Sequence, residues 1–321
     1  MKNKLFGGPL LATLLGCALT AHAQDYPSRP VKIIVPIASG ASFDTAARLF
    51  AEKLREKWGQ PVIVENRAGA GHNIGAEAVS RAVPDGYTLL FAPPPSLVIN
   101  KSLFAKLAYD PDAFAPISVV LSTYNVLVVH PKVAADSVPQ LIELARTNPD
   151  RLNYASAGSG TTPHLAAELF KTMAGVRIVH IPYKGTSPAI MELIGGQVEI
   201  MIADIGLAHP HIRAGKLRLL AVASEKRNST FPDIPAISEV LPGFLSVIWL
   251  GAIAPAGTPP AITHRVSAAI AEVLKQPDIA RRLADMSFDP IGSTPEQMAQ
   301  FMTQERERWS SVIRTSGATA N

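Results

Sequence analysis

Short runs of β-branched residues alternate with longer amphipathic stretches along most of this sequence. A first set of such runs lies at 31–36, 62–66 and 87–91. A second set lies at 152–156, 177–183, 197–203 and 217–223. The stretches between the runs have the spacing of apolar residues that is typical of helices. Because strands that alternate with helices pair in parallel through crossover connections, the pattern predicts two α/β units.

The region between the two units contains two extended runs, at 117–122 and 124–131, where the chain could cross from one unit to the other. The C-terminal part has one apolar run at 247–255 and three predicted helices but no complete βαβ set, so it is predicted to complete the first unit. Two chain crossings between the units would form a hinge with a cleft between the two domains. Clefts at domain interfaces are common ligand-binding sites. The predicted fold is α/β with two lobes: residues 24–124 plus 247–321 form domain 1, and residues 125–246 form domain 2.

The first 23 residues have the pattern of a secretory signal peptide. Lys2 and Lys4 precede an apolar stretch at 5–18, which is followed by the small residues Ala21 and Ala23. A membrane-spanning helix needs about 20 apolar residues, and this stretch is shorter and interrupted by two glycines and a proline. We therefore expect cleavage near Ala23 and a periplasmic mature protein.

Cys17 is the only cysteine in the chain. It ends the segment Leu-Leu-Gly-Cys at 14–17, which resembles a lipoprotein signal, so lipidation at Cys17 stays open as an alternative. Cleavage at Ala23 would leave no cysteine for disulfides, thiolate catalysis or metal binding. It would also remove two lysines from a chain of formal net charge +4, and the other basic residues are scattered. Nucleic acid is therefore not a predicted partner.

The common signatures of catalysis are absent from the sequence: there is no G-x-S-x-G elbow, no phosphate-binding G-x-x-x-x-G-K-S/T loop and no H-E-x-x-H zinc motif. The segment GAGHNIG at 69–75 has the wrong glycine spacing for a dinucleotide site. His209 and His211 would make only a loose metal site, without a third ligand nearby. We expect no enzyme activity, no cofactor and no metal, although a hydrolase that uses Ser, His and Asp from the cleft stays open.

Two loops of small residues each follow a predicted strand and open a predicted helix. They lie at 36–44 and at 157–164, one in each predicted domain. The unpaired N–H groups and the positive dipole end of such a helix favour an anion, and small side chains let a carboxylate approach the backbone. The alternative for the first loop is a tight turn in which Ser42 caps the helix. Loops from two domains could close on one ligand.

Asp204 follows the apolar run at 197–203 and is expected at the carboxyl end of a strand, on the side of the same cleft. There it could bind a cationic or hydroxyl group of a ligand. It could equally cap the helix that is predicted to begin near Gly206.

Seven segments together resemble the Bug family, the exported substrate-binding receptors of tripartite tricarboxylate transporters. They are YPSRPVKIIVP (26–36), GQPVIVENRAGAGHNIGAE (59–77), PDGYTLLF (84–91), YASAGSGTTPHLAAELF (154–170), HIPYKGTSPAIMELIGGQVEIM (180–201), IRAGKLRLLAVAS (212–224) and GAIAPAGTP (251–259). The resemblance covers nearly the whole mature chain. It implies a two-lobed, Venus-flytrap periplasmic-binding-protein fold of type II-like form. It also implies a receptor for an amino acid, a di- or tricarboxylate or an aromatic acid, with membrane transporter subunits as partners. Because such a receptor must open freely, we expect a monomer. A sensor protein as partner stays open.

In this family the loops that correspond to 38–44 and 156–162 hold a carboxylate through backbone amides, small hydroxyls and ordered water. The predicted ligand-binding residues are Ser39, Gly40, Ala41, Ser42, Phe43, Asp44, Ser96, Ser156, Gly158, Ser159, Thr161, Thr162 and Asp204. The first loop departs from the usual pattern P-F-x-x-G-G-x-T-D, because Ile37, Ala41 and Phe43 replace an aromatic residue, a glycine and a threonine. An aromatic ring at Phe43 could line the cleft, which suggests an aromatic or bulky carboxylate as ligand.

Overall fold

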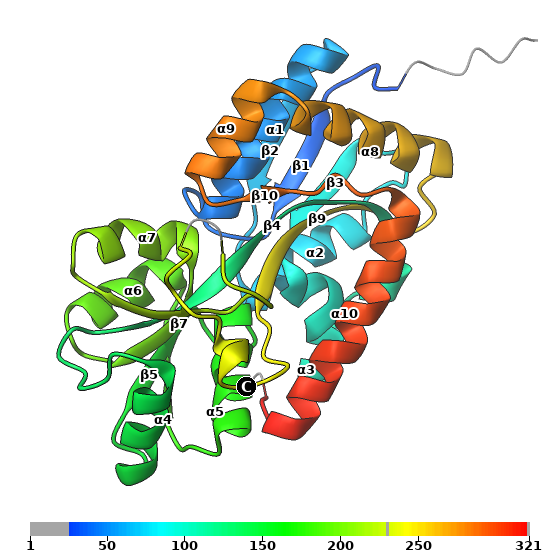
Figure 1. Cartoon of the computed structure of the whole chain (residues 1–321). Helices are drawn as coiled ribbons and strands as arrows, with labels where there is room; N and C mark the ends of the chain where they lie inside the picture. Colours follow the sequence, from blue (N-terminus) through cyan, green and yellow to red (C-terminus); the bar gives the residue numbers. More distant parts are fainter. Residues whose placement is uncertain (1–25, 229–230, 320–321) are drawn as a thin grey trace, which may run out of the picture.

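The computed structural model describes residues 26–228 and 231–319 (Figure 1). The predicted signal peptide, its cleavage site and Cys17 lie outside these residues. No helix in the described part combines the length and the apolarity that crossing a membrane would require.

The strands and helices follow the alternation that the sequence predicts. The strands are β1 (Val31–Val35), β2 (Val62–Asn66), β3 (Thr88–Ala92), β4 (Ala115–Val129), β5 (Asn153–Ser156), β6 (Val179–Pro182), β7 (Ile200–Asp204), β8 (Arg218–Val222), β9 (Val247–Ala254) and β10 (Asp289–Pro290). The helices are α1 (Ser42–Trp58), α2 (Asn73–Ser80), α3 (Asn100–Leu103), α4 (Val138–Thr147), α5 (Thr162–Ala174), α6 (Thr186–Ile194), α7 (Ile205–Arg213), α8 (Pro260–Leu274), α9 (Pro277–Asp285) and α10 (Pro295–Ser316). Short helical turns form η1 (Ala70–His72), η2 (Pro95–Ile99), η3 (Pro111–Ala113) and η4 (Ile237–Glu239).

The described strands form one mixed sheet in the order β2-β1-β3-β9-β4-β7-β5-β6, and β8 and β10 also pair with β4. At one end β1 pairs in parallel with β2 and β3, and at the other β5 pairs in parallel with β6 and β7. The long strands β4 and β9 run antiparallel to each other in the middle. In parallel units of this kind, ligands bind beyond the carboxyl ends of the strands.

Strand β4 changes partners along its length. Tyr124 pairs with Val247 of β9, whereas the next residue, Asn125, pairs with Asp204 of β7. Beside this point the chain returns through Ser246, whose N–H donates to the carbonyl of Ala223 and whose carbonyl accepts from the N–H of Asn125. In Figure 1 the two parts of the sheet lie in two lobes that these two segments connect. We call the lobe with β1–β3 lobe 1 and the lobe with β5–β7 lobe 2.

Both faces of the lobe 1 sheet are buried, because neighbouring residues of a strand point to opposite sides. Ile33 belongs to the cluster beneath α1, α8 and α9, and Ile34 belongs to the cluster beneath α2 and α10. Lobe 2 is built in the same way: Leu127 packs with α4 and α5, while Val126 packs with α6 and α7. Leu165 of α5 belongs to the cluster formed by α10, so the last helix of lobe 1 also contacts lobe 2.

Candidate functional site

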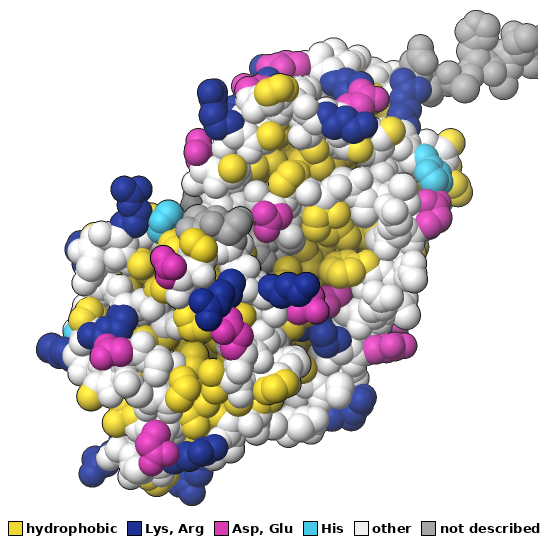
Figure 2. Space-filling view, viewed as in Figure 1, with side chains coloured by type: hydrophobic (Ala, Val, Ile, Leu, Met, Phe, Trp, Pro, Cys, Tyr) yellow, Lys and Arg dark blue, Asp and Glu magenta, His cyan; other side chains and the backbone are white. Residues whose placement is uncertain are grey.

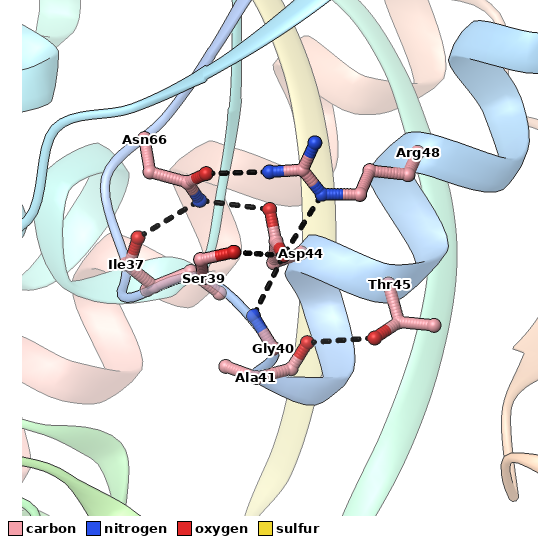
Figure 3. Close-up of polar contacts among 8 residues, drawn as sticks. All are labelled: Ile37, Ser39, Gly40, Ala41, Asp44, Thr45, Arg48 and Asn66. Atoms are coloured by element: carbon pink, nitrogen blue, oxygen red, sulfur yellow. Dashed lines mark hydrogen bonds and ion pairs between the residues drawn. The ribbon is translucent and has the colours of Figure 1, made fainter.

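The loop between β1 and α1 is held in shape by the carboxylate of Asp44 (Figure 3). Its Oδ2 accepts hydrogen bonds from the N–H of Gly40 at 2.8 Å and from Nε of Arg48 at 3.1 Å. Its Oδ1 accepts from Nδ2 of Asn66 at 2.7 Å, and the residue is only 1% exposed. Burial by itself would raise the pKa of this carboxyl, but the hydrogen bonds from Arg48, Gly40 and Asn66 outweigh it and hold the pKa below its usual value.

These contacts give Asp44 a structural role, which is to hold the backbone of the loop in place. The sequence predicts Asp44 as a ligand-binding residue, whereas in the structure both carboxylate oxygens bind groups of the protein. The hydroxyl of Ser39 also lies 3.4 Å from Oδ2, beside the exposed backbone of Gly40. Asp44 therefore fixes the backbone on which an anion could bind.

Asn66 is a residue of this site that the sequence analysis does not identify. Besides Asp44, its Nδ2 donates to the carbonyl of Ile37 at 3.1 Å, and its Oδ1 accepts from Arg48 at 2.7 Å. It is the last residue of β2 and pairs with Val35, the last residue of β1. A polar residue at the end of the neighbouring parallel strand was the available signal, because such strand ends meet at one edge of the sheet.

Helix α1 begins without a side-chain cap. Ala41 is its N-cap residue and provides no side-chain hydrogen bond, so the alternative that Ser42 caps this helix is wrong. The first helical bond is the one from the N–H of Thr45 to the carbonyl of Ala41 at 3.0 Å. The preceding N–H groups have no side-chain cap and lie at the positive end of a 17-residue helix, which is the arrangement that favours an anion.

The ring of Phe43 lies in the core of lobe 1 and does not line a cleft, so this sequence-based expectation is wrong. The residue is 6% exposed and stacks on Phe288 with ring centroids 5.4 Å apart. The reason is helical periodicity: Phe43, Ala46, Ala47 and Phe50 form the buried face of α1. This side chain therefore gives no support to an aromatic ligand.

The second loop, between β5 and α5, repeats the arrangement in lobe 2. Thr161 is the N-cap residue of α5 and does not cap it with its side chain, which donates instead to the carbonyl of Gly158 at 2.7 Å. Gly158 and Gly160 have φ angles of +119° and +82°, which only glycine adopts without strain. Pro163 lies in the first turn, as the sequence predicts. Ser156, Thr161 and Thr162 are buried, and Ser159 is partly exposed.

Asp204 caps helix α7, which confirms one of its two predicted roles. Its Oδ1 accepts from the N–H groups of Gly206 at 2.7 Å and Leu207 at 3.3 Å. The residue is 8% exposed, and burial raises the pKa of its carboxyl to about 6 although both backbone hydrogen bonds act in the opposite direction.

The two lobes approach each other where α7 begins. A Cβ atom added to Gly206 would lie 3.7 Å from Oγ of Ser42 and 3.0 Å from the carbonyl oxygen of Met286, both in lobe 1. The structure therefore brings the first loop close to the Asp204 cap, across the lobe junction. It also shows why a residue without a side chain stands at position 206.

Ser96 and Asn125 are buried polar residues with unused hydrogen-bonding capacity. Ser96, in η2, is 0% exposed, and its Oγ has no hydrogen-bond partner among the described residues. The same holds for Oδ1 of Asn125, whose Nδ2 donates to Oγ of Ser246 at the lobe crossing at 2.7 Å. Buried polar atoms without a partner are costly and uncommon in folded proteins. Asn125 was not identified from the sequence.

The described residues contain no group of three or more His, Cys, Asp or Glu side chains that could hold a metal ion. The ring of His209 packs edge-on against Phe231 at 5.2 Å. On the face shown in Figure 2, basic and acidic side chains lie interspersed over both lobes.

Known proteins resemble the chain over nearly its full length. The family model described as "Tripartite tricarboxylate transporter family receptor" matches residues 46–318. Protein BugT of Bordetella pertussis is 37% identical over 314 residues, which cover 97% of this chain and 96% of that protein. A protein encoded in the tcbD-tcbE intergenic region of Pseudomonas sp. (strain P51) is 35% identical and covers 97% of this chain and 94% of its own length.

Solved structures have the same fold. Rpa4515 of R. palustris, solved with adipate, has a TM-score of 0.87 and 35% identity and covers 92% of this chain and 99% of its own. MatC of Rhodopseudomonas palustris, solved with bound malate, has a TM-score of 0.82 and 33% identity over 90% of this chain and 100% of its own. BugD, described as a periplasmic binding protein, has a TM-score of 0.83 and 32% identity over 92% of this chain and 99% of its own. The predicted two-lobed α/β binding-protein fold is thus confirmed, and the chain belongs to the receptor family of tripartite tricarboxylate transporters, which includes the Bug proteins.

Proposed function

We propose that this protein captures a small dicarboxylate in the periplasm and presents it to the membrane subunits of a tripartite tricarboxylate transporter. The observation that carries the proposal is the pair of helix N-termini, one in each lobe, that lack side-chain caps and follow small-residue loops. Their N–H groups suit a carboxylate, and two such sites suit a ligand with two anionic ends.

The choice of a dicarboxylate rests on two kinds of support. The relatives Rpa4515 and MatC were solved with adipate and malate, which are both aliphatic dicarboxylates. Phe43, which suggested an aromatic ligand, has its ring in the core. A malate- or adipate-like solute therefore fits the sequence, the structure and the relatives together.

The proposed mechanism is capture by closure, without chemical change of the ligand. Lobes 1 and 2 are connected by β4 and by the return segment at Ser246, which is the arrangement of a hinge. A carboxylate held by both loops would favour the closed form, and the transporter would recognise that form by its shape. Export by the signal peptide at residues 1–23 would deliver the receptor to the compartment where this capture takes place.

Isothermal titration calorimetry of the exported protein tests the proposal. The ligands are adipate, malate, glutamate, citrate and phthalate, with adipamide as the control that keeps the length of adipate but lacks both charges. We expect at least one aliphatic dicarboxylate to bind and adipamide not to bind. If no carboxylate binds, or if adipamide binds as tightly as adipate, the proposal is wrong.

Replacing Gly158 by valine tests the second loop directly. Gly158 has φ +119°, and an added Cβ would lie 3.2 Å from the carbonyl oxygen of Tyr183, so the loop must shift. We expect dicarboxylate affinity to fall by at least about tenfold, because the backbone amides lose their alignment. Gly175→Ala is the matched control: this glycine, at the other end of α5, also has positive φ but no atom within 4 Å of its added Cβ. The control should lose some stability and keep its affinity.

A further inference from the structure

Three aromatic rings pack together next to the second loop, which joins β5 to α5. Tyr154 of β5 and His180 of β6 are paired across the two strands, with ring centroids 4.7 Å apart. The ring centroid of His164, in the first turn of α5, lies 4.3 Å from that of His180 and 6.5 Å from that of Tyr154. The interplanar angles of the two contacts of His180 are 14° and 24°, so the imidazole rings are held nearly parallel.

Each imidazole takes part in a hydrogen bond that reaches one glycine amide of the loop. The N–H of Gly160 donates to Nδ1 of His164 at 3.1 Å. The N–H of Gly158 donates to Oγ of Ser156 at 3.1 Å, and this Oγ lies 2.6 Å from Nε2 of His180. The two histidines thus act on Gly160 directly and on Gly158 through a serine hydroxyl.

Donor counting assigns the protons on both rings. Nδ1 of His164 accepts a hydrogen bond and therefore carries no proton, which leaves the proton on Nε2. The buried hydroxyl of Ser156 has one proton, and among the described residues His180 is its only acceptor. Ser156 therefore donates to Nε2 of His180, whose proton is on Nδ1. The bond from Gly160 exists only while His164 is neutral, and Ser156 can donate to His180 only while that ring is neutral.

The surroundings keep both rings neutral at physiological pH. Burial is the main cause that lowers the pKa of each ring, to about 4 for His180. Lys171 of α5 also lowers the pKa of both rings, and His164 lowers the pKa of His180. Glu168 of α5 acts in the opposite direction, but it accepts hydrogen bonds from Lys171 at 2.7 Å and from the hydroxyl of Tyr154.

We propose that His164 and His180 are positioning residues of the second loop: as neutral acceptors they fix the amides of Gly160 and Gly158, so that the rest of the loop is aligned for a carboxylate. The loop has two glycines in left-handed conformations and would otherwise move easily. This inference rests on the proposed carboxylate site and adds to it the groups that shape that site.

The first test needs no ligand. Long-range ¹H–¹⁵N NMR spectra of the exported, ligand-free protein report which ring nitrogen carries the proton. We expect an unprotonated Nδ1 in His164, an unprotonated Nε2 in His180, and no charge on either ring at pH 7.5. Opposite tautomers, or a charged ring at pH 7.5, would overturn the inference whether or not the protein binds a dicarboxylate.

The second test uses crossed amide substitutions, with adipate and malate titrated by calorimetry. The side-chain oxygen of asparagine can replace Nδ1 and that of glutamine can replace Nε2. His164→Asn and His180→Gln therefore keep an acceptor in place, whereas His164→Gln and His180→Asn misplace it. We expect the first pair to stay within about threefold of the unmodified protein and the second pair to bind about tenfold more weakly or worse.

All four variants remove a ring from the stack. Thermal unfolding should therefore show that the two pairs lose similar amounts of stability. Equal losses of affinity in all four would mean that the rings only pack, which contradicts the inference. If the unmodified protein binds neither adipate nor malate, the proposed function fails instead, and the NMR test still decides the role of the histidines. The NMR test also decides it if a variant does not fold.

Discussion

Two buried aspartates at the lobe junction show how local donors decide what a carboxylate does. Asp44 is bound by an amide N–H, a guanidinium and a side-chain amide, and its pKa lies below the usual value. Asp204 has only two backbone donors, and its pKa is raised to about 6. The difference arises because the cationic Arg48 lies beside Asp44, while no cause of the Asp204 shift is a positive charge.

The raised pKa of Asp204 predicts a pH-dependent contribution to stability. Between pH 3.8, the ordinary pKa, and pH 6 the folded protein holds a proton that the unfolded chain has lost, so this residue destabilises the fold as the pH rises. Asp204→Asn keeps a good N-cap and removes the charge. We expect the variant to gain stability relative to the unmodified protein between pH 4.5 and pH 8, by on the order of 1–3 kcal/mol.

Urea unfolding of both proteins at pH 4.5, 6 and 8 measures this difference. Because other titrating groups are shared, their contributions cancel when the two proteins are compared at each pH. A stability difference that does not change with pH would contradict the assigned pKa.

At the level of elements, helix α10 connects the lobe 1 sheet to the lobe crossing. Glu305, 7% exposed, accepts from the indole N–H groups of Trp249 at 3.0 Å and Trp309 at 3.2 Å. It also binds Arg308 through two hydrogen bonds of 2.8 and 2.9 Å. Arg308 in turn donates to the carbonyl of Leu245, directly before the crossing at Ser246. One buried carboxylate thus links β9, α10 and, through Arg308, the crossing segment at Leu245 and Ser246.

Removing this carboxylate should destabilise the fold strongly. Glu305→Ala leaves two buried indole N–H groups and a partly buried guanidinium without their acceptor, which should cost about 3 kcal/mol of the free energy of unfolding. Glu305→Gln keeps one acceptor oxygen and should lose less. The exposed Glu307, two residues away, is the matched control, and Glu307→Ala should stay within about 0.5 kcal/mol. Denaturant unfolding measures all three, and equal stability of Glu305→Ala and Glu307→Ala would refute this role.

For the whole molecule, the described residues connect the two lobes in several places. They include the chain crossings at Tyr124–Asn125 and at Ser246, the packing of α5 against α10, and the approach of Gly206 to lobe 1. The crossings contain paired backbone and side-chain groups, including the bond from Asn125 to Ser246. A ligand that contacts loops of both lobes adds a further connection, so its binding should favour the compact form.

Ligand binding should therefore stabilise and compact the protein. At a dicarboxylate concentration of about 100 times Kd, the free energy of unfolding should rise by about 2.7 kcal/mol, which raises Tm by several degrees. The radius of gyration from small-angle X-ray scattering should decrease at the same concentration. Adipamide at equal concentration should change neither quantity. A dicarboxylate that binds in calorimetry but leaves the radius of gyration unchanged would exclude closure as the mechanism.

Features that have a local period or a local cap could be predicted from the amino-acid sequence. The alternation of strands and helices predicts the α/β fold, and the small-residue loops predict where α1 and α5 begin. The periodicity of α1 even contained the answer for Phe43, because positions 43, 46, 47 and 50 share one helical face. Local patterns are visible in sequence because neighbouring residues determine them.

Features that depend on partners distant in the chain could not be predicted, because they form only when the chain folds. Asn66 reaches Asp44 because β1 and β2 pair in register, and His180 reaches Ser156 because β5 and β6 do. Nothing within a few residues of Asp44 shows that Asn66 will complete its hydrogen bonds. The same carboxylate could therefore be predicted from the sequence as a ligand contact, while packing made it the support of the loop. The position of Asp44 at the start of a helix makes both roles possible, and the hydrogen-bond donors that folding brings to its carboxylate determine which role it has.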